Sequence, residues 1–252
     1  MQRRHRLHQI VSAVVERGQV DVPSLVTEFS VSAATIRRDL EALQQQRLVC
    51  RTHGGATLHA AFNDLPLSYK RARDLPEKQR IARHAAALLD GARVIGTTGG
   101  TTVSQFIRLL RGRDDLTVVT NALNVAIDLV GNPGLRVFVA GGEVRGSSQE
   151  SVGPSAEAFL AEYDIDVAFL GVDGVDAVAG CTNYDPAGAR VNAVLARRAR
   201  KRVVLADATK IGRVTLARVC RMAEVDVLIT DSRAAEAELE PLRRQGCTVA
   251  CV

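Results

Sequence analysis

Tryptophan is absent from this 252-residue chain, and all aromatic residues together make up only 4% of it. Its hydrophobic core must therefore be built mainly from aliphatic side chains, within a hydrophobic share of 46%. With 24% charged residues, the composition is that of a globular protein and excludes a chain that is disordered as a whole. The length suits either one large α/β domain or a small module joined to a mid-sized one.

Cysteine is scarce too, and long apolar runs are missing. The five cysteines are odd in number and form no C-x-x-C pair, which favours neither a disulfide framework nor a zinc site and suits a reducing cytoplasm. No stretch approaches 18 uninterrupted apolar residues, and the first ten residues lack the apolar run of an export signal. We therefore expect a cytoplasmic protein with no metal, no cofactor and no membrane partner.

Two nucleotide-binding motifs are also missing. The G-x-x-x-x-G-K-[ST] pattern of P-loop NTPases does not occur. Nor does a spaced G-x-G-x-x-G follow the first apolar run of the larger module, at 92–97. The sequence thus excludes the P-loop class and disfavours a dinucleotide site.

Positive charge is unevenly distributed along the chain. Residues 1–80 contain 13 Lys and Arg against 8 Asp and Glu, whereas residues 81–252 contain 20 of each, so the first third carries the whole net charge of +5. A basic module attached to a neutral body is typical of polyanion binding. A basic surface without a functional partner is the alternative that charge alone leaves open.

Helical periodicity in the first module predicts three helices, over 5–17, 22–29 and 33–46. The last two are separated by a tight turn, which is the helix-turn-helix arrangement whose second helix enters the DNA major groove. The run 48–57 then alternates and turns at a glycine pair, as a β-hairpin wing does. Small residues followed by hydrogen-bond donors suit a groove-reading helix, and basic wing residues suit phosphate. The candidate DNA contacts are Ser32, Ala33, Thr35, Arg37, Arg38, Arg51 and His53.

The stretch Ser32-Ala-Ala-Thr-Ile-Arg-Arg-Asp-Leu40, at its spacing from the first helix, resembles the N-terminal signature of the DeoR family of bacterial transcriptional regulators. The match continues through RTHGGA at 51–56. This resemblance implies a winged helix-turn-helix domain over 1–57 that binds double-stranded operator DNA. A plain helical bundle with a solvated arginine face would explain neither the wing nor the charge asymmetry. Asp39 is expected to pair with a nearby arginine and to position the helix.

The rest of the chain has a different pattern. Residues 58–76 lack periodicity and hold two prolines, so we expect a connector over 58–75. From residue 76 onward, short Val-rich runs are mostly separated by helix-length segments, which predicts an open, largely parallel α/β sheet covered on both faces. About seven strands can be counted, too few for a closed eight-stranded barrel. The runs are 92–97, 116–120, 135–140, 166–171, 202–207, 225–230 and 247–252.

Ligands of open α/β sheets bind beyond the carboxyl ends of the strands, and these ends are polar or glycine-rich here. The run 97–102, TTGGTT, precedes a helix, so glycines, hydroxyls and a helix N-terminus together favour a phosphate. Lys210 offers a point charge for phosphate, and Asn121 suits sugar hydroxyls. An ordinary turn or cap is the alternative for each residue taken alone. The candidate effector contacts are Gly99, Gly100, Thr101, Thr102, Asn121, Gly141, Gly142, Gly171, Asp207 and Lys210.

The DeoR resemblance extends over almost the whole chain, through EK-x2-IA at 77–82, LTVVTN at 116–121, FLGVDG at 169–174 and D-x-x-K-x-G at 207–212. It implies a 76–252 effector domain similar to ribose-phosphate isomerases, with a phosphorylated sugar or related metabolite held at the strand ends. Thr97 stands where the family commonly has Asp.

We therefore expect a DNA-binding transcriptional regulator, a repressor of carbohydrate-metabolism genes, whose operator binding responds to a phosphorylated sugar. A two-fold operator implies a homodimer or homotetramer. Two alternatives stay open: a sugar-phosphate isomerase-like enzyme with an appended DNA-binding head, and a co-regulatory protein without a ligand. Isomerisation needs a general base beside the bound carbonyl, and we predict no catalytic residue.

Overall fold

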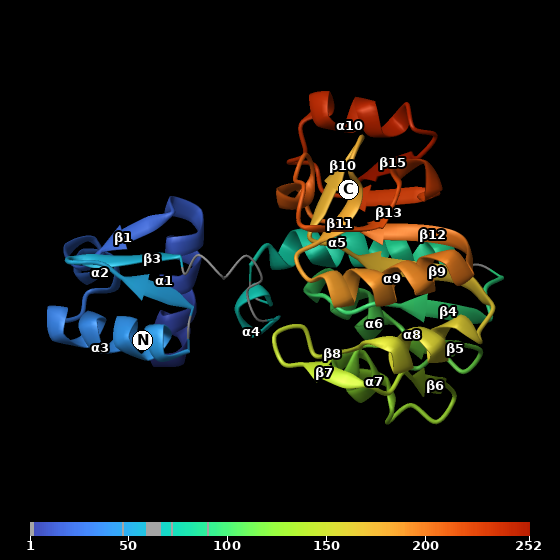
Figure 1. Ribbon diagram of the computed structural model, residues 1–252, viewed down its shortest axis with the longest axis horizontal. Helices are drawn as coiled ribbons and strands as arrows, with labels where there is room; N and C mark the ends of the chain where they lie inside the picture. The colour runs from blue at the N-terminus through green and yellow to red at the C-terminus, as the bar shows by residue number, and fades with distance from the viewer. Residues whose placement is uncertain (1–2, 47, 59–66, 72, 90) are drawn as a thin grey trace. The chain divides into compact units, whose positions relative to one another are not determined.

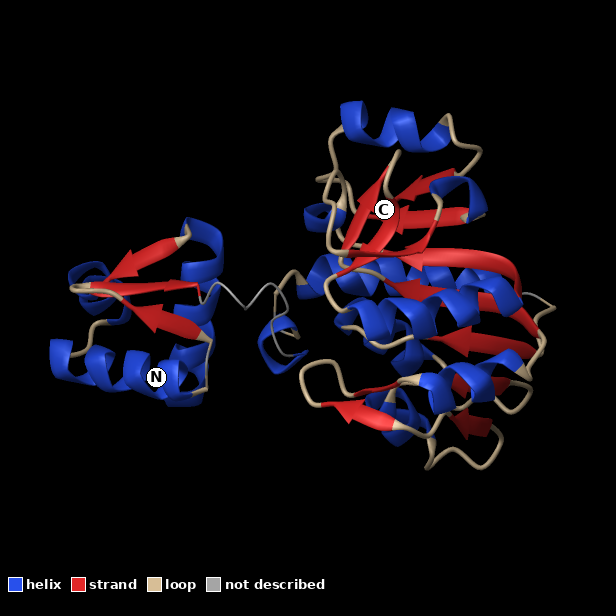
Figure 2. Cartoon of the chain, viewed as in Figure 1, coloured by secondary structure: helices blue, strands red, loops and turns tan. Residues whose placement is uncertain are grey.

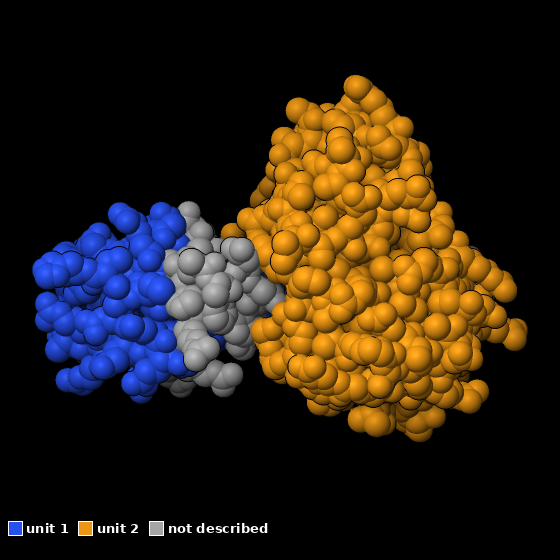
Figure 3. Space-filling view, viewed as in Figure 1, with its two compact units in different colours: residues 1–70 blue, residues 71–252 orange. Residues whose placement is uncertain are grey.

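The structure, a computed structural model, describes residues 3–46, 48–58, 67–71, 73–89 and 91–252. The chain divides into two compact units, residues 1–70 and 71–252 (Figure 3). The first unit extends beyond the predicted end at residue 57 because helix α4 (Leu67–Lys70) packs onto it. Tyr69 stacks on His8 with ring centroids 4.4 Å apart and donates a hydrogen bond to Gln46 Oε1 at 3.0 Å. Residues 67–70 of the predicted connector are therefore part of the first unit, and 59–66 lie outside the described residues.

Besides α4, the described part of the first unit contains three longer helices and a small antiparallel sheet (Figures 1 and 2). The two hairpin strands are those that the sequence predicts, and a third strand, β1, precedes α2 and pairs with β3. Aliphatic side chains from all three helices and the sheet fill its core, which is drawn from residues 7–69. Its elements are α1 (Arg3–Arg17), β1 (Gln19–Asp21), α2 (Val22–Phe29), α3 (Ala33–Gln45), β2 (Val49–Arg51) and β3 (Gly55–Leu58).

Capping residues define where α2 and α3 begin. The Asp21 carboxylate accepts a hydrogen bond from Ser24 N at 2.7 Å, and Pro23 lies in the first turn of α2, where a missing N–H costs nothing. Ser32 caps α3 through its Oγ, which accepts from Thr35 N at 3.2 Å. The turn between the helices is therefore set by local chemistry.

The second unit is built on a seven-stranded sheet with strand order β15-β14-β12-β9-β4-β5-β6. Every neighbouring pair in this sheet is parallel. Each strand overlaps one of the seven predicted runs, so the predicted open parallel α/β fold is confirmed. The strands are β4 (Val94–Thr97), β5 (Thr117–Thr120), β6 (Arg136–Val139), β9 (Ile165–Gly171), β12 (Ala199–Leu205), β14 (Val227–Thr230) and β15 (Thr248–Cys251).

Helices cover both faces of this sheet (Figure 1). Side chains alternate along each strand, so Phe169 joins the core beneath one layer of helices while Ala168 and Leu170 join the core beneath the other. One layer holds α5 (Leu75–Ala86), α6 (Thr101–Leu109) and α7 (Leu123–Leu129), and the other holds α8 (Pro154–Ala161), α9 (Pro186–Arg198) and α10 (Glu236–Arg243). Both clusters are drawn from residues 81–252.

Two smaller sheets, which the sequence analysis did not predict, join this framework. Their strands are only three or four residues long, too short for a clear period-two pattern. One sheet has the order β10-β11-β13, and the other is the β7–β8 hairpin. Their bounds are β7 (Glu143–Arg145), β8 (Glu150–Val152), β10 (Gly174–Asp176), β11 (Gly180–Asn183) and β13 (Ala217–Cys220), with 3-10 turns η1 (Ala87–Leu89), η2 (Ala208–Lys210) and η3 (Met222–Glu224).

Candidate DNA-binding surface and effector site

A groove of about 580 Å³ lies between α2, α3 and the wing of the first unit. Its lining includes Arg37 from α3 and Arg51 and His53 from the wing, so the structure brings these three predicted contacts together. All three residues are exposed, and neither arginine has an ion-pair or hydrogen-bond partner in the described part of the chain. Two guanidinium groups and an imidazole are thus available for phosphates or base edges.

The other predicted contacts have different surroundings. Ala33 lines the same groove at the start of α3. The hydroxyl oxygens of Ser32 and Thr35 lie 3.0 Å apart and bond to each other while Ser32 caps the helix. Arg38 is exposed but does not belong to the groove lining. The small residues therefore shape the beginning of the helix, and the charges lie farther along it.

Asp39 is buried inside the first unit and pairs with arginine, as predicted. Its carboxylate accepts a hydrogen bond from Arg6 Nε at 2.6 Å and another from Arg3 Nε at 3.3 Å. Asp39 is 1% exposed and Arg6 is 7% exposed, so this ion pair has lost most of its water. It joins α3 to α1 and orients the helix that carries Arg37.

In the second unit, the predicted effector residues lie at the carboxyl edge of the parallel sheet. The chain runs from β4 to β5 and β6 on one side, and β9 then pairs with β4 on its other side. Such a topological switch point is where open α/β sheets bind ligands. Gly99 and Gly100 follow β4, and Gly171 ends β9 at this junction.

Close packing at the junction requires glycine. A Cβ added at Gly171 would lie 2.6 Å from the carbonyl oxygen of Gly99, and Gly171 N donates to Thr98 Oγ1 at 2.8 Å. Gly100 has a φ of 111° and precedes α6, whose first residues, Thr101 and Thr102, are buried. The glycines therefore let two strand ends meet beside a helix N-terminus.

Glu150 of β8 is a site residue that the sequence analysis missed. Its Oε1 accepts a hydrogen bond from Gly99 N at 2.8 Å, so the amide expected to meet a ligand contacts a carboxyl group. Burial raises the pKa of Glu150, although the Gly99 hydrogen bond and the Arg145 charge act in the opposite direction. The Gly99 amide is therefore already paired within the protein.

Two buried polar atoms near these strand ends have no hydrogen-bond partner among the described residues. They are Thr97 Oγ1 at the end of β4 and Asn121 Oδ1 after β5, both on fully buried residues. Buried polar atoms are nearly always paired, so atoms like these indicate a place for water or a ligand. Asn121 Nδ2 donates to Ser151 O at 3.3 Å, which fixes the amide.

Gly141 and Gly142 lie apart from the other candidates. They follow the edge strand β6, which β5 separates from β4. Gly142 has a φ of 145°, and a Cβ there would lie 2.8 Å from Val152 O. This close approach explains the glycine as part of the turn into the β7–β8 hairpin, and the structure does not bring the pair to the β4–β9 junction.

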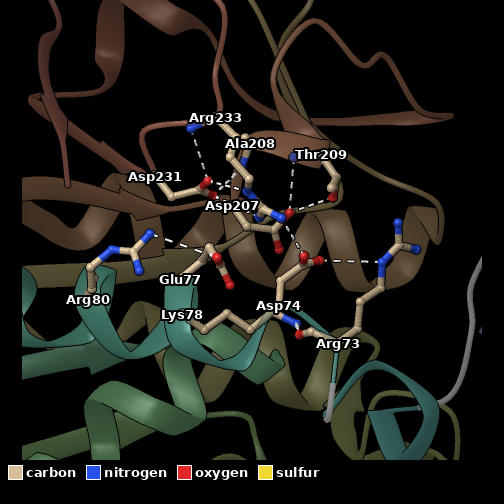
Figure 4. Close-up of polar contacts among 10 residues, drawn as sticks. All are labelled: Arg73, Asp74, Glu77, Lys78, Arg80, Asp207, Ala208, Thr209, Asp231 and Arg233. Carbon is tan, nitrogen blue, oxygen red and sulfur yellow. Dashed lines mark hydrogen bonds and ion pairs between the residues drawn. The ribbon is translucent and has the colours of Figure 1, made fainter.

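Farther along the same edge, Lys78 approaches Asp207 and Lys210. Lys78, from α5, is 3% exposed, and its Nζ donates to Arg73 O at 2.5 Å (Figure 4). Burial lowers the pKa of Lys78 to about 8, and the Lys210 charge acts in the same direction, whereas Asp207 opposes it. In the sequence, Lys78 stands out only as part of the family motif EK-x2-IA.

Asp207 itself caps the turn after β12. Its Oδ1 accepts from Thr209 N at 3.1 Å and from the Thr209 hydroxyl (Figure 4). The capping role that was the alternative for this residue is therefore present. It holds η2, which carries Lys210, at the strand end.

Arg233 fixes the neighbouring strand end to the start of α5. Its guanidinium donates to Asp74 Oδ1 and to Asp231 Oδ1, both at 2.6 Å (Figure 4). Ala208 N donates to Asp231 Oδ2 at 2.7 Å. Burial alone would raise the pKa of Asp231, but the hydrogen bonds from Arg233 and Ala208 outweigh it and lower that pKa. The network holds α5, and with it Lys78, against the ends of β12 and β14.

Within the described residues, no group of three or more His, Cys, Asp or Glu side chains could hold a metal ion. No described helix is long and apolar enough to cross a membrane.

Comparison with known proteins covers both units. The family model of the DeoR-like helix-turn-helix domain matches residues 6–61, and that of the DeoR C terminal sensor domain matches residues 73–232. The glycerol-3-phosphate regulon repressor of Escherichia coli K12 is 32% identical over 232 residues, 92% of each chain. The HTH-type transcriptional regulator GlpR of Haloferax volcanii is 31% identical over 245 residues, 97% of this chain and 96% of that one.

Among solved structures, ribose 5 phosphate isomerase A from Neisseria gonorrhoeae is 18% identical, with a TM-score of 0.39 over 56% of this chain and 54% of that one. The two relatives named above are regulators, and the isomerase-like alternative is not carried forward. Because its helix-turn-helix and its sensor domain both match, the chain belongs to the DeoR family of transcriptional regulators.

Proposed function

We propose that this regulator represses carbohydrate-metabolism genes and that a phosphorylated sugar releases it from its operator. The observation that carries the proposal is the groove in which Arg37 of α3 lies with Arg51 and His53 of the wing. In this arrangement α3 enters the major groove, and the wing contacts the backbone beside it. Arg38 and the small residues Ser32, Ala33 and Thr35 complete the surface.

Replacing Arg37 by alanine is expected to weaken specific operator binding by about 1–3 kcal/mol, roughly ten- to hundredfold, because an exposed guanidinium is lost from the reading helix. The measurement is fluorescence anisotropy on a DNA fragment selected from the source genome, at fixed salt. Arg197→Ala, an exposed arginine of the second unit, serves as the matched control. Unchanged specific binding by Arg37→Ala would show that α3 does not read the operator.

We further propose that the phosphate of the effector lies between the β4–β9 junction and the two lysines. The amides at the start of α6 and the Lys78 and Lys210 charges suit an anion. Asn121, with its unpaired buried oxygen, suits a sugar hydroxyl. The wider set of proposed contacts is Gly99, Gly100, Thr101, Thr102, Gly171 and Asp207.

A screen of phosphorylated sugars and sugar alcohols tests this site. A true effector at a hundred times its Kd stabilises the folded protein by about 2.7 kcal/mol, which raises its melting temperature. The same compound should also lower operator affinity. A ligand shifts the equilibrium between the DNA-binding and the non-binding state only if it binds one of them more tightly, so this effector must prefer the non-binding state. The unphosphorylated sugars are the controls. A panel without any such compound would favour the alternative of a co-regulatory protein without a ligand.

We also propose that the protein binds its operator as a homodimer or homotetramer. Helix-turn-helix proteins read two half-sites about one helical turn apart, which requires two copies of α3. Two exposed apolar side chains of the second unit, at 73% and 77% exposure, are Ile127 of α7 and Val130, the residue just after that helix. Light scattering on the purified protein gives the number of copies.

A further inference from the structure

Two cysteines lie opposite each other in the small sheet of the second unit. Cys181 of β11 pairs with Cys220 of β13 in the antiparallel register, and both are free thiols. Directly opposed residues in antiparallel strands have Cα atoms about 4.5–5.5 Å apart, within the range of about 4.4–6.8 Å that a disulfide spans. The strand register, which shifts only after Cys181, therefore places the two backbones at a spacing that a disulfide can span, and the two thiols share a hydrogen bond.

The two thiols differ in their access to solvent. Cys181 is completely buried, whereas Cys220 is 8% exposed and lines a groove of about 630 Å³. The groove admits a small molecule to Cys220 and leaves Cys181 behind it. Five arginines share its lining with two glutamates: Arg190, Arg197, Arg202, Arg218 and Arg221, with Glu157 and Glu224.

Local electrostatics favour a thiolate at Cys220. A hydrogen bond with the Cys181 thiol lowers the pKa of Cys220, and the Arg202 charge acts in the same direction against burial and Glu224. The same hydrogen bond and burial raise the pKa of Cys181. Reactive cysteines lie in such electropositive, partly accessible places, and redox-sensing cysteines often have a second cysteine beside them.

We propose that Cys220 and Cys181 form a thiol pair that hydroperoxides oxidise to a disulfide. The Cys220 thiolate attacks the terminal oxygen of the peroxide, the O–O bond breaks, and the leaving alkoxide or hydroxide takes up a proton. Cys220 becomes a sulfenic acid. Cys181 then loses its proton and attacks the Cys220 sulfur, and the hydroxyl leaves as water. One peroxide is reduced to an alcohol or water, a second water forms, and two thiols become one disulfide.

The experiment treats the reduced full-length protein with hydrogen peroxide, blocks remaining thiols with N-ethylmaleimide under denaturing conditions, and maps the peptides by mass spectrometry. The expected product is a Cys181–Cys220 disulfide, with Cys247 still alkylated. Cys181→Ser should stop at the Cys220 sulfenic acid, which dimedone traps. Cys251→Ser, which removes an exposed thiol, is the matched control and should form the disulfide at the normal rate.

Two outcomes would overturn the proposal. One is a wild-type protein in which the exposed Cys251 is oxidised while Cys220 remains a thiol; the other is a disulfide between Cys220 and Cys247. Since wild-type protein alone decides both, the test does not depend on the folding of any variant. Arg202→Gln should slow disulfide formation several-fold while Arg202→Lys keeps the rate. If Arg202→Gln formed the disulfide as fast as Arg202→Lys, the result would contradict activation of Cys220 by the Arg202 charge.

Discussion

Asp39→Ala is expected to destabilise the 1–70 unit by about 3–5 kcal/mol, because removing one partner of a buried ion pair leaves the other charge uncompensated. That charge is the guanidinium of Arg6, whose residue is only 7% exposed. At about 0.05–0.15 kcal/mol per residue, a unit of this size has a total stability of the same order. The unit should therefore unfold well below the wild-type temperature and lose operator binding with it. Urea denaturation followed by circular dichroism measures the change.

Arg38→Ala is the matched control for this experiment. Arg38 precedes Asp39 in α3 but is exposed and without an ion-pair partner in the described chain. Its replacement should change the free energy of unfolding by less than about 0.5 kcal/mol. A variant that loses DNA binding but keeps its stability then identifies a residue that contacts DNA. A variant that loses both identifies a residue that stabilises the fold. A normal unfolding curve for Asp39→Ala would contradict the structural role assigned to the Arg6–Asp39 pair.

Lys78→Met is expected to weaken effector binding by about 1.5–3 kcal/mol, roughly ten- to hundredfold, because a charged hydrogen bond to the phosphate is lost. The same substitution should change the stability of the free protein little, since loss of the hydrogen bond to Arg73 O is offset by removal of the cost of burying an ammonium group. Isothermal titration with the effector and thermal unfolding of the free protein measure the two effects. Weaker binding with unchanged stability separates a ligand contact from a purely structural residue.

The pKa of about 8 for Lys78 adds a pH dependence to the same site. Below pH 8 the side chain is charged and attracts phosphate; as pH rises through 8 it becomes neutral, so affinity should fall between pH 7 and 9. Binding of a phosphate dianion would raise this pKa again, and a proton would be taken up. Lys78→Met should show a flat profile in this range, whereas Lys210→Met should keep a fall in affinity but at higher pH, because the Lys210 charge no longer lowers the pKa of Lys78. A flat wild-type profile would refute the contact.

Several features of the fold follow from local patterns in the sequence. The seven parallel strands are buried on both faces and therefore appear as continuous Val-rich runs. Ser32 and Asp21 mark helix starts because their side-chain oxygens satisfy amides only three residues away. The position of Arg37 on an exposed helix face follows from the 3.6-residue period. Each of these features depends on residues that are close in the chain.

The rest of the candidate site depends on contacts between distant residues. Arg233 and Asp74 are 159 residues apart, and Glu150 meets Gly99 across 51. In the sequence, Glu150, Asp231 and Lys78 look like ordinary solvent-facing charges, since nothing beside them shows that they are buried. Gly142 shows the opposite case: a glycine pair after a strand resembles a ligand loop, but the close approach of Val152 O explains Gly142 as part of a turn.

Each of the two units encloses its own core, the first from residues 7–69 and the second from residues 81–252. This independence has an evolutionary consequence. Mutations that retune the sugar recognised by the second unit leave the packing of the first intact, and changes in operator preference leave the effector pocket intact. The specificities for operator and for sugar can therefore diverge separately among paralogues. Recombination near the boundary at residues 70 and 71 can also join the DNA-binding unit to a different sensor domain.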